Sequence, residues 1–179
     1  IVDDGVHHHF LVMEYVEGQT LRALLDELER VPEELCRHIA REVAKGLAAI
    51  HAAGVVHRDL KPENVLITKD HAVKVMDLGV ARLADEAIRL SQSGAFVGSV
   101  EYAAPEQFSP GRGTDPRTDL HAVGVLLYEL ACGTNPHRAG DFRETTAKIL
   151  NELPVPLGEA NPQVSPFFEE FVHRLLAKD

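Results

Sequence analysis

Two short polar motifs contain the residue types that could do chemistry in this chain. Residues 57–64 read His-Arg-Asp-Leu-Lys-Pro-Glu-Asn, and an Asp-Leu-Gly triplet begins at position 77, thirteen residues after Asn64. Asp59 can accept a proton, while the carboxamide of Asn64 and the carboxylate of Asp77 supply the oxygen ligands that Mg²⁺ demands. One base and two metal ligands at this spacing suit magnesium-assisted phosphoryl transfer.

The residues between the two motifs predict the structure that brings them together. Val65–Ile67 and Val73–Met76 are short β-branched runs separated by a polar stretch, a pattern typical of an antiparallel hairpin. Asn64 precedes the first strand and Asp77 follows the second, so pairing of the strands makes these two residues neighbours. We therefore expect one metal-binding pocket, with Asp59 projecting from the same loop.

On these motifs the chain resembles the protein kinases, and within them the serine/threonine kinases of the bacterial type, over nearly its whole length. The resemblance implies that Asp59 accepts or orients the proton of the substrate hydroxyl, and that Asn64 and Asp77 hold magnesium ions. It also implies that Lys61 stabilises charge on the transferred phosphoryl group, which favours serine or threonine acceptors over tyrosine. The implied cofactors are ATP and Mg²⁺, and the implied partner is a protein substrate with a Ser/Thr acceptor.

The chain downstream of Asp77 carries a further part of this resemblance. The segment from Asp77 to Glu106, which ends in Ala-Pro-Glu, resembles the kinase activation segment. Ser99 lies in a Gly-Ser-Val-Glu-Tyr stretch that resembles the family's Gly-Thr-x-x-Tyr element. By this resemblance Ser99 would contact Asp59 and Lys61 and help to shape the seat for the substrate hydroxyl.

Two serines inside this segment suggest regulation. Ser91 and Ser93 occupy the place where bacterial relatives carry phosphorylated hydroxyls, and Arg58, next to the base, is the cation that would pair with such a phosphate. The resemblance therefore predicts activation by autophosphorylation, in which two copies of the kinase would form a homodimer and one would phosphorylate the other. The alternative is that both serines are polar loop residues without a function.

An apolar run near the amino terminus resembles the kinase hinge. Phe10–Met13 is short enough for a buried strand, and the residues after it turn the chain towards a helix. By resemblance, the backbone groups of Glu14 and Val16 would hydrogen-bond the adenine. Met13 would be the gatekeeper behind the ring, and Leu66 would form the apolar floor beneath it. Taken alone, the same run predicts only a core strand that ends in a glycine turn.

Apolar periodicity predicts a mostly helical scaffold around these motifs. Leu35, Ile39, Val43 and Leu47 recur every four residues after Pro32, which indicates an amphipathic helix that leads into the catalytic loop. The stretch 120–132 is apolar almost all round and should be buried. Further helices are predicted from near residue 20 and over residues 142–150 and 166–177, with a proline-rich connection at 153–162.

Asp119 stands at the start of the most apolar of these helices. A side-chain oxygen at that point can accept from the first backbone N–H groups, so we expect Asp119 to cap the helix. By the kinase resemblance, Asp119 also anchors the backbone of the catalytic loop, and His57 is a structural residue of that loop.

Together these patterns predict one domain, mostly α with short β-hairpins, like the C-lobe of a protein kinase (α+β) with most of the small N-terminal lobe absent. Residues 1–18 would form the last strands of the small lobe and the hinge, and residues 19–179 the C-lobe, with the catalytic loop at 57–64 and the activation segment at 77–106. No glycine-rich phosphate loop or strand lysine precedes the hinge. We therefore expect a fragment, truncated at both ends, that binds nucleotide weakly by itself.

Composition limits the other function classes. The net charge of −10 in 179 residues argues against nucleic acid as a partner, because nucleic acids favour basic surfaces. Cys36 and Cys132 lie among apolar helical residues, which favours reduced core thiols and a cytoplasmic location over a disulfide. The longest apolar run is far short of the roughly twenty residues of a membrane helix, although an anchor elsewhere in the full-length protein stays open. Three consecutive histidines at 7–9 cannot all face one metal ion, which favours a surface role.

Three classes of function remain in play, and a serine/threonine protein kinase is the leading one. A small-molecule phosphotransferase has a related catalytic loop, but Lys61 and the long segment that ends at Glu106 favour an extended protein substrate. The third class is a pseudokinase that acts as a binding or regulatory module, because the strand lysine is absent although Asp59, Asn64 and Asp77 are intact.

Overall fold

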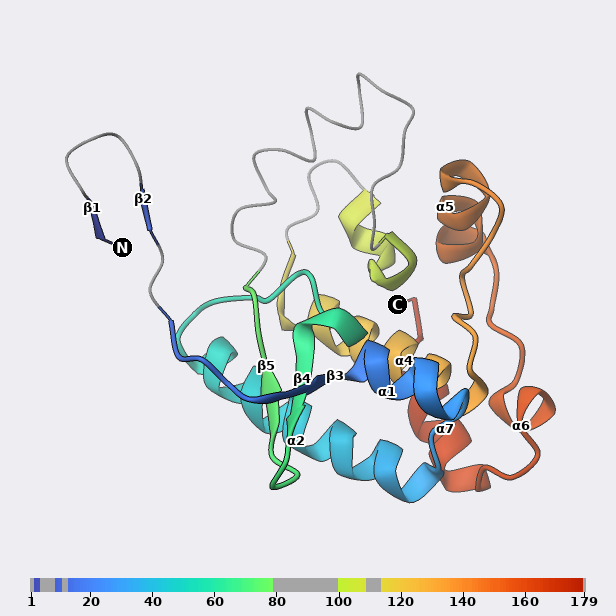
Figure 1. The fold of residues 1–179 in the computed structure, drawn as a ribbon. Helices are drawn as coiled ribbons and strands as arrows, with labels where there is room; N and C mark the ends of the chain where they lie inside the picture. Colours follow the sequence, from blue (N-terminus) through green and yellow to red (C-terminus); the bar gives the residue numbers. More distant parts are fainter. Residues whose placement is uncertain (1, 4–8, 11–12, 79–99, 109–113, 179) are drawn as a thin grey trace.

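An antiparallel sheet of three short strands lies beside a group of helices in the computed structural model of the chain (Figure 1). The structure describes residues 2–3, 9–10, 13–78, 100–108 and 114–178. Strands β3 (Gly18–Thr20), β4 (Val65–Thr68) and β5 (Val73–Val75) lie in the order β3-β4-β5. A separate antiparallel pair near the amino terminus consists of β1 (Val2–Asp3) and β2 (His9–Phe10).

The hairpin predicted between the two polar motifs is confirmed. β4 and β5 pair in antiparallel fashion with Val65 opposite Val75, and the β-branched residues in both strands suit this pleated, half-buried surface. One step beyond this register, the backbone N–H of Met76 donates to the carbonyl oxygen of Asn64 at 2.8 Å. This bond holds the backbone just before Asp77 beside Asn64, as the strand pattern predicted.

Helices supply most of the remaining described structure, and the predicted ones are present. The hydroxyl of Thr20 caps the first of them by accepting from the N–H of Ala23 at 3.2 Å. One helix was missed: α6 lies inside the predicted proline-rich connection, because its four residues are too few to show a helical period. The helices are α1 (Leu21–Leu28), α2 (Glu33–Ala52), α4 (Pro116–Cys132), α5 (Phe142–Asn151), α6 (Leu157–Ala160) and α7 (Pro166–Leu175), and the 3₁₀ turns are η1 (Pro62–Asn64), η3 (Val100–Tyr102) and η4 (Pro105–Phe108).

The core forms around α4, which packs against both α2 and α7 (Figure 1). Burial of the stretch 120–132 is confirmed except at its first residue, since Leu120 is 42% exposed. Three of the four residues in the repeat on α2 are buried, each contributing about 1.5–3 kcal/mol by removal of apolar surface from water. Both cysteines are buried and free, as predicted.

Gly133 ends α4 and allows the chain to turn back towards α1. Its φ of 78° lies in the left-handed region, and a Cβ atom there would approach the carbonyl oxygen of Glu29 to 2.3 Å. Both the backbone conformation and the close approach therefore require glycine.

The predicted capping role of Asp119 is wrong. α4 begins one turn earlier, at Pro116, and its cap is Asp115, whose Oδ1 accepts from the N–H of Arg117 at 2.8 Å. Proline suits the first helical position because its fixed φ matches the helix and its missing N–H needs no partner there. Asp119 is thus inside the first turn and fully buried, where its carboxylate is available to another part of the chain.

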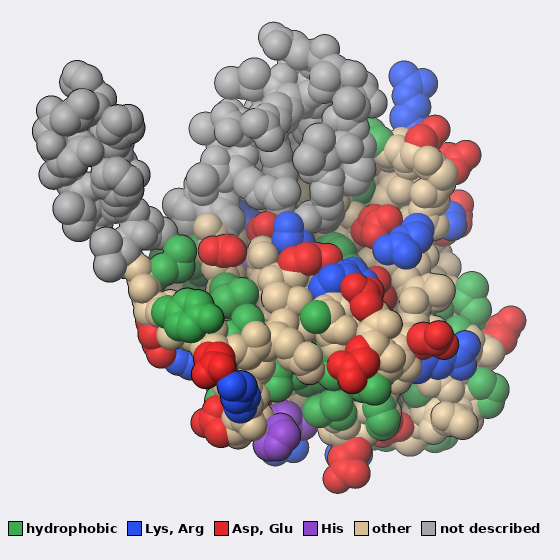
Figure 2. Space-filling view, in the orientation of Figure 1, with side chains coloured by type: hydrophobic (Ala, Val, Ile, Leu, Met, Phe, Trp, Pro, Cys, Tyr) green, Lys and Arg blue, Asp and Glu red, His purple; other side chains and the backbone are tan. Residues whose placement is uncertain are grey.

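Charged side chains of both signs lie on the face of the molecule that Figure 2 draws. Figure 2 shows red and blue side chains mixed over the face that is drawn rather than gathered by sign. None of the described helices has both the length and the apolar character needed to cross a bilayer.

Two histidines form an unusual polar pair in the core. His121 in α4 and His137, which follows that helix, lie with their rings nearly parallel, at 8°, and their centroids 6.0 Å apart. Both ring nitrogens of His121 and Nε2 of His137 have no hydrogen-bond partner among the described residues. Burial lowers the pKa of His121 to about 4 and that of His137 to about 3, with Lys178 near both rings, so both are neutral at pH 7.

This pair should make the fold sensitive to acid. In the unfolded chain both imidazoles regain a pKa near 6.5, so unfolding takes up protons below that pH and stability falls as the pH drops towards 4 and then 3. We expect the free energy of unfolding to fall by several kcal/mol from pH 7 to pH 4, since each tenfold change in proton affinity corresponds to about 1.4 kcal/mol. Urea unfolding at a series of pH values measures this. The double variant His121→Phe/His137→Phe should lose much of the slope, and an unchanged slope would contradict the assignment.

Candidate active site

The catalytic-loop residues 57–64 connect α2 to β4, and the structure gathers the predicted polar side chains there. Asn64 is buried, and its Nδ2 donates to Oδ2 of Asp59 at 3.0 Å and to the carbonyl oxygen of Asp59 at 2.8 Å. Lys61 Nζ lies 3.4 Å from the same Oδ2. One carboxylate, one ammonium and one carboxamide therefore meet within a single loop.

Asp77 approaches this cluster through backbone contacts. Its neighbour Met76 donates its N–H to the carbonyl of Asn64, and the carbonyl of Met76 lies 2.9 Å from Nε2 of His57. The carboxyl group of Asp77 is exposed. The predicted proximity of the two motifs is thus present in the backbone, and His57 is one of the residues that hold it.

The backbone at Arg58 and Asp77 adopts a rare conformation. Their φ values of 67° and 53° lie in the left-handed region, which costs non-glycine residues about 1–2 kcal/mol. Such a conformation persists only where the surroundings hold it, and it is concentrated at functional sites. Glu29 and His71 also have positive φ, but Arg58 and Asp77 lie in the two polar motifs, so part of the strain coincides with the cluster.

The carboxylate of Asp119 holds the backbone at Arg58 by hydrogen bonds. Its Oδ1 accepts from the backbone N–H of Arg58 at 2.8 Å, and its Oδ2 accepts from the backbone N–H of His57 at the same distance. The Nε2 atom of His51, near the end of α2, lies 2.6 Å from Oδ2. A buried carboxylate with three donors is well compensated, and here it ties α4 to the catalytic loop and to α2.

His51 was missed by sequence reasoning. It is separated from Asp119 by 68 residues, so no local pattern links the two. The available signal was its place on the helix that leads into the catalytic loop, six residues before His57.

The predicted nucleotide-binding residues lie in the segment that leads into β3 and in β4. Met13 is 66% exposed, and the carboxylate of Glu14 pairs with Lys74 Nζ at 2.7 Å. Val16 is half-buried in the segment that leads into β3. Leu66 is buried in β4, opposite Thr20 of β3.

Several predicted activation-segment residues lie outside the described residues, namely Ser91, Ser93 and Ser99. Glu106 is half-buried, and its Oε1 accepts from the hydroxyl of Thr118 at 2.7 Å. Nε of Arg58 is buried and has no hydrogen-bond partner among the described residues.

The oxygen ligands offered by Asn64 and Asp77 fit magnesium. The described residues hold no group of three or more His, Cys, Asp or Glu side chains that could bind a metal. Magnesium does not need such a group, because it retains waters and takes phosphate oxygens alongside one or two protein ligands. Nδ2 of Asn64 is directed at Asp59, which leaves its carboxamide oxygen as an acceptor, and Asp77 adds an exposed carboxylate.

Comparison with known proteins agrees with the site geometry. The family model described as protein kinase domain matches residues 3–179, so the chain belongs to the protein kinase family. It is 44% identical to the serine/threonine-protein kinase PknL of Mycobacterium tuberculosis over 170 residues, 94% of this chain and 42% of that protein. It is 37% identical to a probable serine/threonine-protein kinase of Clostridium perfringens over 172 residues, 96% of this chain and 25% of that protein. A third relative, the serine/threonine-protein kinase PknB of Mycolicibacterium smegmatis, is 35% identical over 171 residues, 95% of this chain and 27% of that protein. The chain thus spans between 25% and 42% of the length of these relatives.

Proposed function

We propose that this chain is the hinge and C-lobe of a serine/threonine protein kinase, which transfers the γ-phosphoryl group of ATP to a Ser or Thr hydroxyl of a protein. Residues 1–18 would be the last small-lobe strands and the hinge, and residues 19–179 the C-lobe. The observation that carries the proposal is the cluster of Asp59, Lys61 and Asn64, with both partners directed at one carboxylate oxygen.

Each member of the cluster has a distinct role in the proposed reaction. Asp59 would orient the acceptor hydroxyl and accept its proton as the bond to phosphorus forms. Lys61 would place its positive charge beside the transferred group and stabilise the charge that develops on it. Asn64 holds Asp59 in place through Nδ2, which limits the motion of the base.

ATP and Mg²⁺ are the proposed cofactors. When bound, magnesium would supply charge neutralisation at the phosphates of ATP. The carboxamide oxygen of Asn64 and the carboxylate of Asp77 would hold it. The backbone of Glu14 and Val16 would face the adenine, with Met13 behind the ring and Leu66 beneath it. The burial of Leu66 in β4 supports its part, because a floor residue must present a rigid apolar surface.

We also propose control through the activation segment, residues 77–106. Phosphorylated Ser91 or Ser93 would pair with Arg58, and two copies of the kinase would meet so that one modifies the other. The buried Nε of Arg58, which lacks a hydrogen-bond partner among the described residues, supports this role. Ser99 would help to position the acceptor hydroxyl. The two free buried cysteines support a cytoplasmic kinase domain.

Acceptor preference tests the proposal. The full-length protein that carries this chain should phosphorylate serine and threonine peptides and leave matched tyrosine peptides unmodified when radiolabelled ATP and Mg²⁺ are supplied. Lys61→Ala should reduce kcat about 10²-fold, the usual effect of removing one charge-stabilising group. Lys69→Ala, which removes an exposed lysine from the hairpin turn, is the matched control and should have full activity.

Two outcomes would overturn the proposal. Phosphate transfer only to a small molecule would indicate a small-molecule phosphotransferase. Binding of ATP without transfer to any acceptor would indicate a pseudokinase.

A further inference from the structure

A short segment that contains two prolines exposes apolar side chains between α5 and α6. Residues 152–156 read Glu-Leu-Pro-Val-Pro, and we call this stretch the proline segment. Leu153 is 84% exposed and Val155 is 53% exposed. Apolar side chains exposed singly are ordinary, but neighbouring ones that form a patch indicate an interaction site. The proline segment is therefore a candidate ligand for another surface.

The two prolines set the backbone conformation of the proline segment. Each proline fixes its own φ at about −65° and keeps the residue before it extended. Pro156 has φ −50° and ψ 132°, close to polyproline II, a helix with three residues per turn. Burial follows that period, because Pro154 is half-buried and Leu157, three residues later, is fully buried, whereas Leu153 and Pro156 are exposed. One edge of the segment thus faces the protein and the others face outward.

Side chains from two helices hold the proline segment in this conformation. The hydroxyl of Tyr128 in α4 donates to the carbonyl oxygen of Val155 at 3.0 Å. The N–H of Leu157, the first residue of α6, donates to Nε2 of His173 in α7 at 3.0 Å. A ligand that is already fixed in its bound shape loses little conformational entropy when it binds.

The surface that suits a polyproline II segment is one lined by aromatic rings. Helix α7 offers such rings, since Phe167 and Phe171 lie one helical turn apart and are 66% and 41% exposed. We call this pair the aromatic face. The guanidinium carbon of Arg37 lies 5.6 Å from the centroid of the Phe167 ring, which places a cation at the edge of the face.

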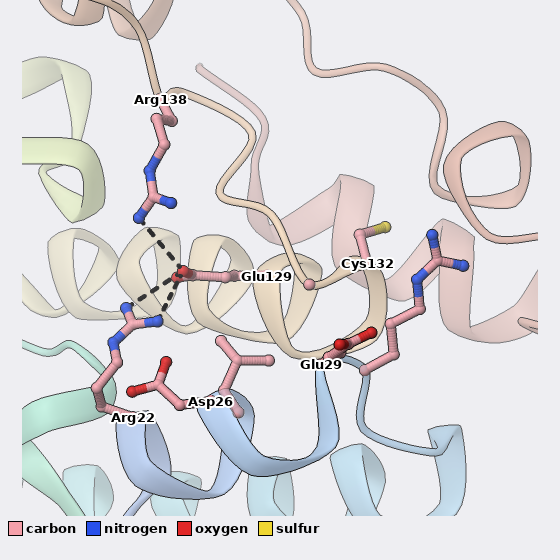
Figure 3. Close-up of a pocket in the computed structure, with 9 residues that line it drawn as sticks. Arg22, Asp26, Glu29, Glu129, Cys132 and Arg138 are labelled. Carbon is pink, nitrogen blue, oxygen red and sulfur yellow. Dashed lines mark hydrogen bonds and ion pairs between the residues drawn. The ribbon is translucent and has the colours of Figure 1, made fainter.

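A hollow beside α1 is a poorer match for the proline segment. Figure 3 shows charged side chains of both signs around it, among them Asp26, Glu29 and Arg138. Leucine and valine side chains docked there would remove water from these charges without replacing its hydrogen bonds. The aromatic face lacks this cost, because its rings need no hydrogen-bond partner.

The charges beside the two surfaces are complementary. Glu152 at the start of the proline segment is exposed, and so is Glu159 just after it. Beside the aromatic face, Arg37 is 57% exposed and Arg174 is 80% exposed. Each arginine has an ion-pair partner in its own chain, but a guanidinium carries five donors and can also bind a second carboxylate.

The proline segment and the aromatic face lie on opposite flanks of α7. On one flank, His173 and Glu169 accept from backbone N–H groups where the proline segment joins α6. Phe167 and Phe171 lie on the other flank, and Glu170 is exposed between the two. If two copies are related by a two-fold axis at this ridge, each proline segment meets the aromatic face of the other copy at the same time.

We propose that the proline segment of one copy of this chain binds the aromatic face of a second copy, so that two copies form a symmetric pair across α7. Leu153 and Val155 of each copy pack on the two rings of the other, and the acidic ends of the segment face the arginines beside those rings. The inference goes beyond the proposed kinase function, because this contact needs neither nucleotide nor phosphate transfer.

Cysteine cross-linking in the full-length protein tests which surfaces meet. One copy carries Leu153→Cys and a second copy, with a different tag, carries Phe167→Cys, while both cysteines of the chain itself are buried. A short bis-maleimide reagent added to the mixture should join the two tags. Asp70→Cys, at an exposed position in the hairpin turn, replaces Phe167→Cys in the control and should give at least about tenfold less of the joined product. Equal yields in the two mixtures would overturn the inference.

Self-association measured by sedimentation velocity gives a second test in the full-length protein. Leu153→Asp and Phe167→Asp should each weaken association about tenfold or more, because in a pair of identical copies either change damages both contacts. Both side chains are mostly exposed, so the variants should fold as the unmodified protein does. Lys69→Asp, which places an acidic residue at another exposed position, is the control and should leave association unchanged.

A mixture of the two aspartate variants distinguishes this pairing from other contacts. In a mixed pair, the intact proline segment of one variant meets the intact aromatic face of the other, so the mixture should associate more tightly than either variant alone. Failure of the mixture to recover, an effect of only one variant, or a protein that is monomeric at every concentration would overturn the inference. These measurements read association alone, so lack of phosphate transfer would count against the proposed function and leave this inference standing.

Discussion

Replacing Asp59 by asparagine should lower the rate of phosphate transfer by about 10³-fold or more in the full-length protein. The carboxamide has nearly the shape of the carboxylate, but it cannot accept the proton of an acceptor hydroxyl. Its oxygen can still accept from Nδ2 of Asn64, so the loop should keep its conformation. We therefore expect ATP to bind in the presence of Mg²⁺ within about twofold of the unmodified protein.

Rate and binding are measured separately for this variant. Single-turnover transfer from labelled ATP to a serine peptide gives the chemical step, and titration with a fluorescent nucleotide gives affinity. Asp70→Asn, the same change in the exposed turn of the hairpin, should be fully active. Activity of Asp59→Asn near that of the unmodified protein would remove Asp59 as the base.

Replacing Asp119 by alanine should strongly lower the free energy of unfolding. Asp119→Ala leaves the backbone N–H groups of His57 and Arg58 and the ring of His51 without their acceptor. Buried donors left in this way cost about 1–3 kcal/mol each, so we expect the free energy of unfolding to fall by about 3–5 kcal/mol. Arg58 would also lose the bond that holds its left-handed backbone, and phosphate transfer should fall about 10²-fold or more.

A matched pair of variants in the same helix isolates this effect. Asp119→Asn keeps one acceptor oxygen but must turn an NH₂ group towards a donor, so it should remain strongly destabilised. Asp115→Asn keeps its capping role because asparagine caps helices as well as aspartate does, and it should change stability by less than about 0.5 kcal/mol. Thermal and urea unfolding compare the two, and equal stabilities would contradict the anchoring role of Asp119.

Local patterns explain why much of the fold was predictable. The four-residue repeat on α2 and the two β-branched runs of the hairpin reflect which faces must be buried, and this information is contained in neighbouring residues. The site residues 57–64 share one loop, so their spacing in the sequence nearly fixes their spacing in the structure.

Other features of the structure depend on where a helix begins or on contacts between residues that are far apart in the sequence. Asp119 was the expected cap of α4, but the helix begins at Pro116, whose fixed φ suits the first helical position, and Asp115 caps it. His51 contacts Asp119 although 68 residues separate them, and no local period connects the two.

The order of residues by itself determined the family resemblance, the content of the catalytic loop and the helices and hairpin around it. The tertiary structure alone decided that Asp115 rather than Asp119 caps α4 and that His51 contacts Asp119. The physical reason is that burial of a charged group becomes tolerable only when its donors arrive together, and the donors to Asp119 come from α2 and the catalytic loop, which meet α4 only after the chain has folded.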